Sequence, residues 1–167
     1  DPEVAPMEFT SYKVNYIKGS DPSKWHRDLR TSKAVMYKNV YENIDLKVYG
    51  MENQVEYDWL VKPGADPGSI RFTYEGGPDT HIDNRGNLVV KGAFGEFTHK
   101  KPFGYQDIDG KKVAVQAKFK EMGENTYGFA VEHYNKDYAL IIDPTVAITY
   151  STYLGGSDYD EGALADN

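Results

Sequence analysis

The feature that most constrains the fold is a pair of alternating segments within Val35–Val61. Ile44–Val48 alternates apolar with charged residues, and Val55–Val61 resumes a period of two after the turn-like Gly50–Asn53. This period places every second side chain on the same face of an extended strand. The stretch therefore predicts a β-hairpin with one buried face.

The hairpin register follows from the buried face, because a slip of one residue would turn that whole face to water. A tight turn centred on Glu52–Asn53 keeps both apolar sets on one side. The predicted inner pairs are Ile44 with Val61, Leu46 with Trp59 and Val48 with Tyr57, and the outer pairs are Lys47 with Asp58 and Tyr49 with Glu56. We expect an ion pair between Lys47 and Asp58, worth roughly 0.2–1 kcal/mol.

Short alternating segments separated by turn residues recur along the rest of the chain. Strands are expected over 9–17, 70–74, 80–83, 87–91, 96–99, 103–107, 113–119, 127–131, 140–142 and 146–150. Single helical turns are expected at Asp21-Pro22, where Ser20 or Asp21 can cap, and at Asp66-Pro67, and a proline suits the first position of each turn. Residues 1–6 are expected to be a loose leader. The pattern predicts an all-β fold, an antiparallel β-sandwich-like domain of many short strands with one or two single-turn helices.

Composition narrows the class of protein. A length of 167 residues suits one domain, and a net charge of −7 argues against a nucleic-acid partner, since phosphate binding needs clustered lysine and arginine. No apolar run approaches the roughly 20 residues of a membrane span, so no membrane insertion is expected. The chain begins without methionine, so we expect that it has been trimmed and that any signal peptide has been removed.

Four stretches together resemble a known family. They are Tyr37–Tyr41 with Ile44–Leu46, Glu56–Asp58 with Pro63–Pro67, Leu140–Pro144, and Tyr150–Ser157. The family is the N-terminal domain of unknown function of bacterial and archaeal cell-surface proteins, which carry seven-bladed β-propeller-type (SBBP) repeats behind that domain. The resemblance implies an all-β domain over 1–149 and the truncated start of a propeller repeat over 150–167. It supplies no catalytic residues and no cofactor.

Two carboxylates are the main catalytic alternative. Glu56 and Asp58 lie two apart on a predicted strand, about 7 Å apart along one face. Paired carboxylates at such a distance can hydrolyse glycosides. The structural alternative is a solvated strand face with a lysine opposite, and we expect this alternative and no catalytic residues.

The weak binding and metal candidates fall elsewhere. Trp25 and Tyr49 are candidates for glycan or protein contact. For a metal we expect no site, and the weak candidates are Asp158, Asp160 and Glu161 in the tail, the alternating Asp79, His81 and Asp83, and a convergence of His26, His81, His99 and His133. The tail from Asp158 is expected to pack poorly.

The sequence thus favours a non-catalytic extracellular or cell-surface module that precedes a β-propeller, with a structural, adhesion or recognition role. The expected partner is the C-terminal propeller of the same chain, and a surface glycan or protein is a further one. A carbohydrate-binding module is the alternative, and a glycoside hydrolase is a third. We expect no cofactor.

Overall fold

The computed structural model describes residues 1–51, 54–75, 79–92 and 95–148. These residues form antiparallel strands and two 3-10 turns, so the predicted all-β sandwich-like fold is confirmed. The strands are β1 (Glu3–Tyr16), β2 (His26–Tyr41), β3 (Ile44–Met51), β4 (Gln54–Val61), β5 (Phe72–Thr73), β6 (Asp79–Ile82), β7 (Leu88–Gly92), β8 (Gly95–His99), β9 (Phe103–Ile108), β10 (Lys111–Gly123), β11 (Thr126–Val131), β12 (Leu140–Asp143) and β13 (Val146–Ile148).

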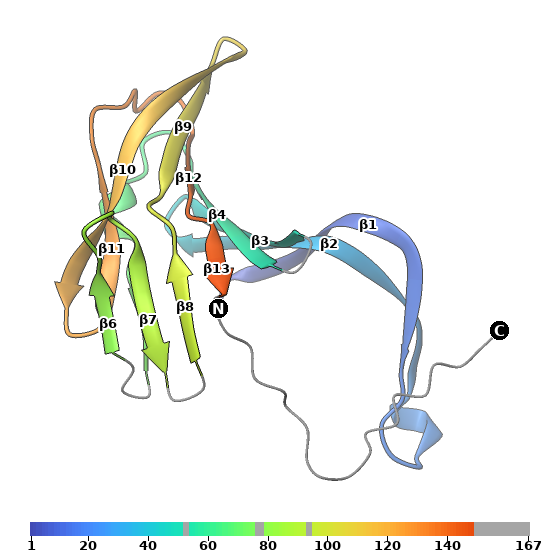
Figure 1. Cartoon of the computed structure of the whole chain (residues 1–167). Coiled ribbons are helices and arrows are strands. Elements are labelled where there is room, and N and C mark those ends of the chain that lie inside the picture. The colour runs from blue at the N-terminus through green and yellow to red at the C-terminus, as the bar shows by residue number, and fades with distance from the viewer. Residues whose placement is uncertain (52–53, 76–78, 93–94, 149–167) are drawn as a thin grey trace.

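The strands form two sheets. The larger has nine strands in the order β1-β2-β3-β4-β12-β9-β10-β11-β5, and the smaller has four in the order β13-β8-β7-β6. Figure 1 shows the four-stranded sheet packed beside β9–β12, while β3, β2 and β1 continue the larger sheet away from this body. The larger sheet is therefore only partly covered, and its β1 edge lies far from the core.

The hairpin register is confirmed along its whole length. Cα partners are Ile44 with Val61, Leu46 with Trp59, Val48 with Tyr57, Lys47 with Asp58 and Tyr49 with Glu56. The turn itself, Glu52–Asn53, lies outside the described residues. The predicted ion pair is wrong, because the ammonium group of Lys47 lies 2.9 Å from a carboxylate oxygen of Glu8 on β1. The acid that pairs with Lys47 thus comes from β1, which is separated from β3 by β2 in the sheet.

The core lies between the two sheets. On β10, Val115, Ala117 and Phe119 are buried and alternate with exposed residues, as a period of two requires. Ile142 on β12 is fully buried, and β12 is hydrogen-bonded to β4 on one side and β9 on the other. The apolar run before Asp143 is thus a central strand, as its composition predicts.

The N-terminal region differs from the sequence-based prediction in two ways. Residues 1–6 are not a loose leader, because β1 begins at Glu3 and pairs with β2 from Glu3 and Lys38 onward. Pro6 fits there because β1 is an edge strand, where a missing N–H costs no ladder bond. The second strand, His26–Tyr41, has 16 residues and was not foreseen, because its apolar residues do not alternate cleanly.

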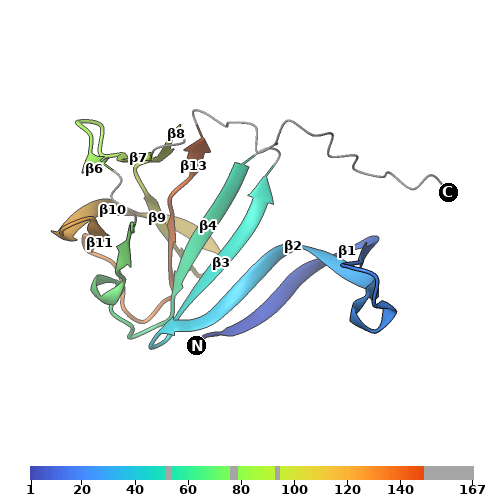
Figure 2. The same ribbon diagram turned by 90° about the horizontal axis from the view of Figure 1, so that it is seen from below.

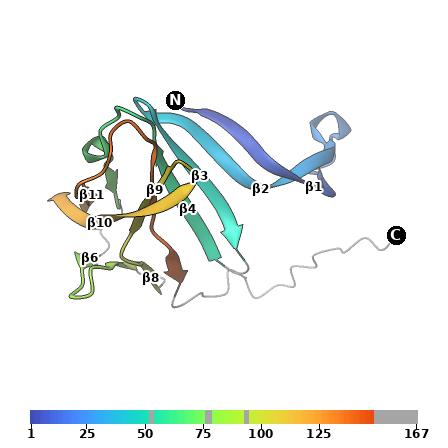
Figure 3. The same ribbon diagram turned by 90° about the horizontal axis from the view of Figure 1, so that it is seen from above.

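The outer half of β1 and β2 forms a projecting two-stranded ribbon, which we call the arm (residues 9–30). Figures 2 and 3 show the arm leaving the body beside β3 and ending far from β6–β11. Register shifts between Phe9 and Lys13 and between Val14 and Tyr16 interrupt its ladder. Such bulges bend a ribbon and increase its twist, which accounts for its curved course.

Single 3-10 turns occur where they were predicted. The first, η1 (Pro22–Lys24), closes the arm tip, and the side chain of Asp21 accepts a hydrogen bond from the Ser23 N–H. The second, η2 (Pro67–Ser69), is capped in the same way by Asp66. Neither these turns nor any other described segment is a helix long and apolar enough to cross a membrane.

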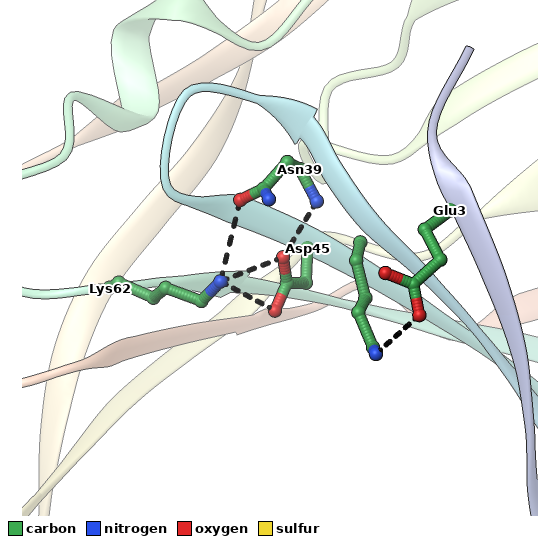
Figure 4. A network of polar contacts seen from close by, with 5 residues as sticks. Glu3, Asn39, Asp45 and Lys62 are labelled. Carbon is green, nitrogen blue, oxygen red and sulfur yellow. Dashed lines mark hydrogen bonds and ion pairs between the residues drawn. The ribbon is translucent and has the colours of Figure 1, made fainter.

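A polar network holds the corner between β2, β3 and β4 (Figure 4). Asp45 is 9 % exposed and accepts hydrogen bonds from the Asn39 N–H at 2.8 Å and from the Lys62 ammonium at 3.0 Å. The Lys62 N–H also donates to the Asn43 carbonyl at 3.0 Å. Since Asn39 and Asn43 both have positive φ, the buried carboxylate stabilises a tight turn that ordinary residues resist.

Candidate functional site

The outer face of the β3–β4 hairpin carries a cluster of three carboxylates. Glu56 is only 6 % exposed, so the expectation of a solvated strand face is wrong. Continuing the pairing of Ile142 with Trp59 by one residue places Asp143 of β12 beside Asp58. The hydroxyl of Tyr49 donates a hydrogen bond to Asp58 at 3.3 Å. The cluster therefore joins Glu56, Asp58 and Asp143 around one tyrosine.

Crowding of acids changes the protonation of this cluster. Burial, and then repulsion by Asp143, raises the pKa of Asp58 to about 6, while Tyr49 and Lys47 oppose the shift. Burial and repulsion by Glu56 also raise the pKa of Asp143. Burial and the neighbouring carboxylates raise the pKa of Tyr49. Asp58 thus titrates close to neutral pH, a property that general acids share.

Acid catalysis also needs a cleft that admits the substrate between two carboxyl groups. Three cavities are lined by described residues, and none of these three is bordered by Glu56, Asp58 or Asp143. Among the described residues, no group of three histidine, aspartate or glutamate side chains has the geometry of a metal site. The hydrolase alternative therefore rests on the carboxylates alone.

The inner face of the same hairpin borders an open cavity of about 260 Å³. Its walls are mainly aromatic and aliphatic and come from four strands and one loop residue: Leu46, Val48, Tyr57, Trp59, Phe72, Thr73, Tyr74 and His99. Leu46 and Val48, which line the cavity from β3, are half-buried. Apolar concavities with a few polar groups are the usual form of small-molecule sites.

The polar group in this cavity is His99 of β8, which is 6 % exposed. Its Nδ1 lies 3.0 Å from the Tyr57 hydroxyl and its Nε2 lies 2.5 Å from the Tyr74 hydroxyl. Burial lowers the pKa of His99 to about 4, so the ring is neutral at pH 7. A neutral imidazole has one donor and one acceptor nitrogen, so one tyrosine donates to it and the other accepts. Both ring nitrogens are therefore occupied.

A second buried polar atom belongs to Trp59, one of the residues that line the cavity. The indole Nε1 of Trp59 is buried and makes no hydrogen bond within the described part of the chain. Trp59 packs near the rings of Tyr41 and Phe129, at centroid distances of 6.1 and 6.5 Å. A buried N–H without an acceptor is costly, typically by about 1–3 kcal/mol.

The two weak binding candidates lie apart and are engaged locally. Trp25 is half-buried at the arm tip, its N–H donates to the Gly19 carbonyl at 3.0 Å, and the Arg27 guanidinium lies 5.3 Å from its ring centre. Tyr49 is half-buried beside the carboxylate cluster, and its hydroxyl is bound to Asp58.

The metal candidates are dispersed. Asp79 and His81 are exposed on β6, while Asp83 caps the following turn by accepting N–H bonds from Arg85 and Asn87, each at 2.8 Å. These bonds, with the Asn87 side-chain amide, lower the pKa of Asp83. The remaining candidates, Asp158, Asp160 and Glu161, lie outside the described residues.

The sequence alone did not identify the aromatic cavity or the third carboxylate. Asp143 is 85 positions from Asp58 and meets it through the pairing of β12 with β4, whereas His99 is 42 positions from Tyr57 and meets it where the smaller sheet packs on the larger one. The available signal was weak: His99 ends a short strand in an inward position, and Asp143 directly follows a buried apolar run. Neither pattern distinguishes a site from an ordinary core.

The comparisons with known proteins identify the family. The family model described as a domain of unknown function, DUF7948, matches residues 1–145. Neither the curated proteins nor the solved structures contain a significant match. Since the family model covers all but the last 22 residues, the chain belongs to the DUF7948 family of domains of unknown function.

Proposed function

We propose that this chain is a non-catalytic recognition module of an extracellular or cell-surface protein, standing ahead of a β-propeller and binding a protein partner through its arm. The observation that carries the proposal is the exposed apolar face of the arm. The position ahead of a propeller and the extracellular setting rest on the resemblance of the sequence to surface proteins with propeller-type repeats.

Within the part of the chain that the structure describes, the arm exposes large apolar side chains. Tyr12 is 76 % exposed, Tyr16 is 55 % and Ile17 is 54 % exposed. Val14 and Leu29 are directly opposite each other across the ribbon and are both exposed. Contiguous apolar surface of this kind is typical of interaction sites, and a two-stranded ribbon by itself is only marginally stable in water.

The other face of the arm is basic. Lys13 pairs with Arg30 across the ribbon, one residue from the Val14–Leu29 pair and so on the opposite side. Residues 9–30 contain five lysines and arginines against two aspartates, a net charge of +3 in a chain of −7. An amphipathic basic ribbon suits a protein surface that has an apolar patch with an acidic rim.

Site-specific photocrosslinking tests this proposal. A benzophenone amino acid replaces Tyr12 on the arm or, as the control, Val113, an exposed residue on β10 of the body. Each protein is illuminated with the envelope fraction of the source organism. We expect a saturable adduct from position 12 only, and we expect competition by unlabelled wild type but not by the variant Tyr12→Ser/Leu29→Ser.

Two further results decide the class of partner. Periodate treatment of the envelope fraction destroys glycans and spares proteins, so loss of the adduct would favour the carbohydrate-binding alternative. Equal adducts from positions 12 and 113, or no saturable adduct, would contradict a recognition role for the arm. The protein with the benzophenone amino acid at position 12 and the variant Tyr12→Ser/Leu29→Ser should both unfold at the wild-type temperature, since exposed substitutions usually change stability by less than about 0.5 kcal/mol.

A further inference from the structure

The polar corner in Figure 4 brings together three groups that can form an amide bond between side chains. The Nζ atom of Lys62 lies 3.5 Å from the Oδ1 atom of Asn39 and 3.0 Å from each carboxylate oxygen of Asp45. An amine, a carboxamide and a carboxylate therefore meet at one point. The proposed function does not use this corner, which lies in the body of the molecule.

We propose that Lys62 and Asn39 form a covalent isopeptide bond, with Asp45 as the proton-transfer group. The neutral Lys62 amine attacks the Cγ atom of the Asn39 carboxamide, and the bond between Cγ and Nδ2 breaks. A proton moves from the attacking amine through the Asp45 carboxylate to Nδ2, which leaves as ammonia. The products are one amide bond and one ammonia molecule, so the reaction needs no oxidant, nucleotide or other co-reactant.

The backbone holds both reacting residues in place. The Asn39 N–H donates to Asp45 at 2.8 Å, and the Lys62 N–H donates to the Asn43 carbonyl at 3.0 Å. The two side chains are thus fixed against the same turn. Reacting groups held about 3–3.5 Å apart react far faster than the same groups free in solution. The corner therefore supplies the proximity that an uncatalysed amide exchange lacks.

The carboxylate at this corner is unusually shielded. The Asp45 side chain is 12 % exposed, whereas the acids that pair with Lys38 and Lys47 are 69 % and 52 % exposed. Exclusion of water strengthens the electrostatic interactions that accompany a proton transfer. The Lys62 side chain is 43 % exposed, so the released ammonia has a path to solvent.

The bond links β2 to the residue that follows β4, across the intervening strand β3. It closes a loop from Asn39 to Lys62, and a cross-link of this kind stabilises a protein mainly by constraining its unfolded chain. Since β2 continues into the arm, the bond also ties the base of the arm to the body.

Mass spectrometry tests the bond directly, because the linked chain is lighter by one ammonia. The purified protein is incubated at pH 8.5, since only the neutral amine attacks. Trypsin produces peptides 39–47 and 48–71 from this region, because proline follows Lys62 and blocks cleavage there. We expect the bond to join these two peptides into one species in folded wild type, and we expect separate peptides after the same incubation in concentrated urea.

Three variants assign the roles. Lys62→Arg keeps the positive charge beside Asp45 but lacks the amine, so it should keep the unlinked mass. Lys38→Arg makes the same substitution at an exposed ion pair and should link as wild type does. Asp45→Ala should link about 100-fold more slowly, as loss of a proton-transfer group typically causes. Should Asp45→Ala fail to fold, the joined peptides of wild type and their loss in Lys62→Arg decide instead.

Four results would overturn the proposal. An unlinked mass for folded wild type after prolonged incubation would exclude the reaction. Loss of ammonia without a joined peptide would indicate ring closure within an asparagine. Loss of one water, with Lys62 joined to Asp45, would assign the bond to a different acceptor. Linkage at the wild-type rate in folded Asp45→Ala would exclude Asp45 as the proton-transfer group.

Discussion

Acid should destabilise this protein through His99. The ring is 6 % exposed, and burial lowers its pKa from 6.5 to about 4. The unfolded chain therefore binds a proton at a pH where the folded protein does not. Stability from the neutral ring is complete above pH 6.5 and is lost as pH falls through about 4.

The size of the loss follows from the two pKa values. One pKa unit corresponds to about 1.4 kcal/mol, so the full shift corresponds to about 3 kcal/mol. Between pH 7.5 and pH 4.5 most of the loss has occurred, and we expect about 2.5 kcal/mol. Asp58 acts in the opposite direction, because its pKa rises from 3.8 to about 6 and its stabilising contribution is lost as pH rises over that range.

Comparing the pH dependence of wild type with that of one variant cancels the contribution of Asp58 and the other carboxylates, because both proteins contain them. Urea unfolding is measured at both pH values for wild type and for His99→Gln, whose amide keeps one donor and one acceptor for the tyrosines but does not titrate. His99→Gln can have any stability at pH 7.5, because only the change between the two pH values is compared. From pH 7.5 to pH 4.5, the unfolding free energy of His99→Gln should fall by about 2.5 kcal/mol less than that of wild type.

The exposed His81 provides the matched control, since His81→Gln makes the same substitution on the surface. Its pH profile should follow that of wild type. Parallel profiles for wild type and His99→Gln would refute the reasoning. An NMR titration that places the pKa of His99 near 6.5 would refute it as well.

Four further substitutions have defined outcomes. Ile142→Ala removes a fully buried side chain from a central strand and should cost about 2–5 kcal/mol in urea unfolding, and a cost below about 1 kcal/mol would contradict central packing. Asp45→Ala leaves the Asn39 N–H without its acceptor and should cost about 1–3 kcal/mol, whereas Lys38→Ala, which breaks only the exposed pair with Glu3, should change stability by less than about 0.5 kcal/mol. Asp58→Asn removes a charge that burial and Asp143 disfavour, so it should stabilise the protein at pH 7.5 relative to wild type and lose this advantage at pH 4.5; an equal effect at both pH values would show that Asp58 is not shifted.

Local sequence patterns were sufficient to predict those strands and turns that are determined by residues close together in the chain. The two capped 3-10 turns follow from Asp-Pro pairs, because aspartate accepts the free N–H groups and proline has none to lose. The hairpin register follows from two alternating faces that must share one side. The length of β1 and β2 could not be read in the same way, because the arm has no buried face to impose a period.

The sequence by itself determined an all-β chain, its turns, and which residues of the β3–β4 hairpin share a face. Only the tertiary structure decided what covers those faces. Pairing of β4 with β12 puts Asp143 beside Asp58 and makes the outer face a cluster of acids rather than a solvated surface. The position of β8 puts His99 between Tyr57 and Tyr74 and forms the aromatic cavity on the inner face. Local propensity depends on near neighbours along the chain, whereas these contacts join residues 42 and 85 positions apart, so they form only when strands pair and the two sheets pack together.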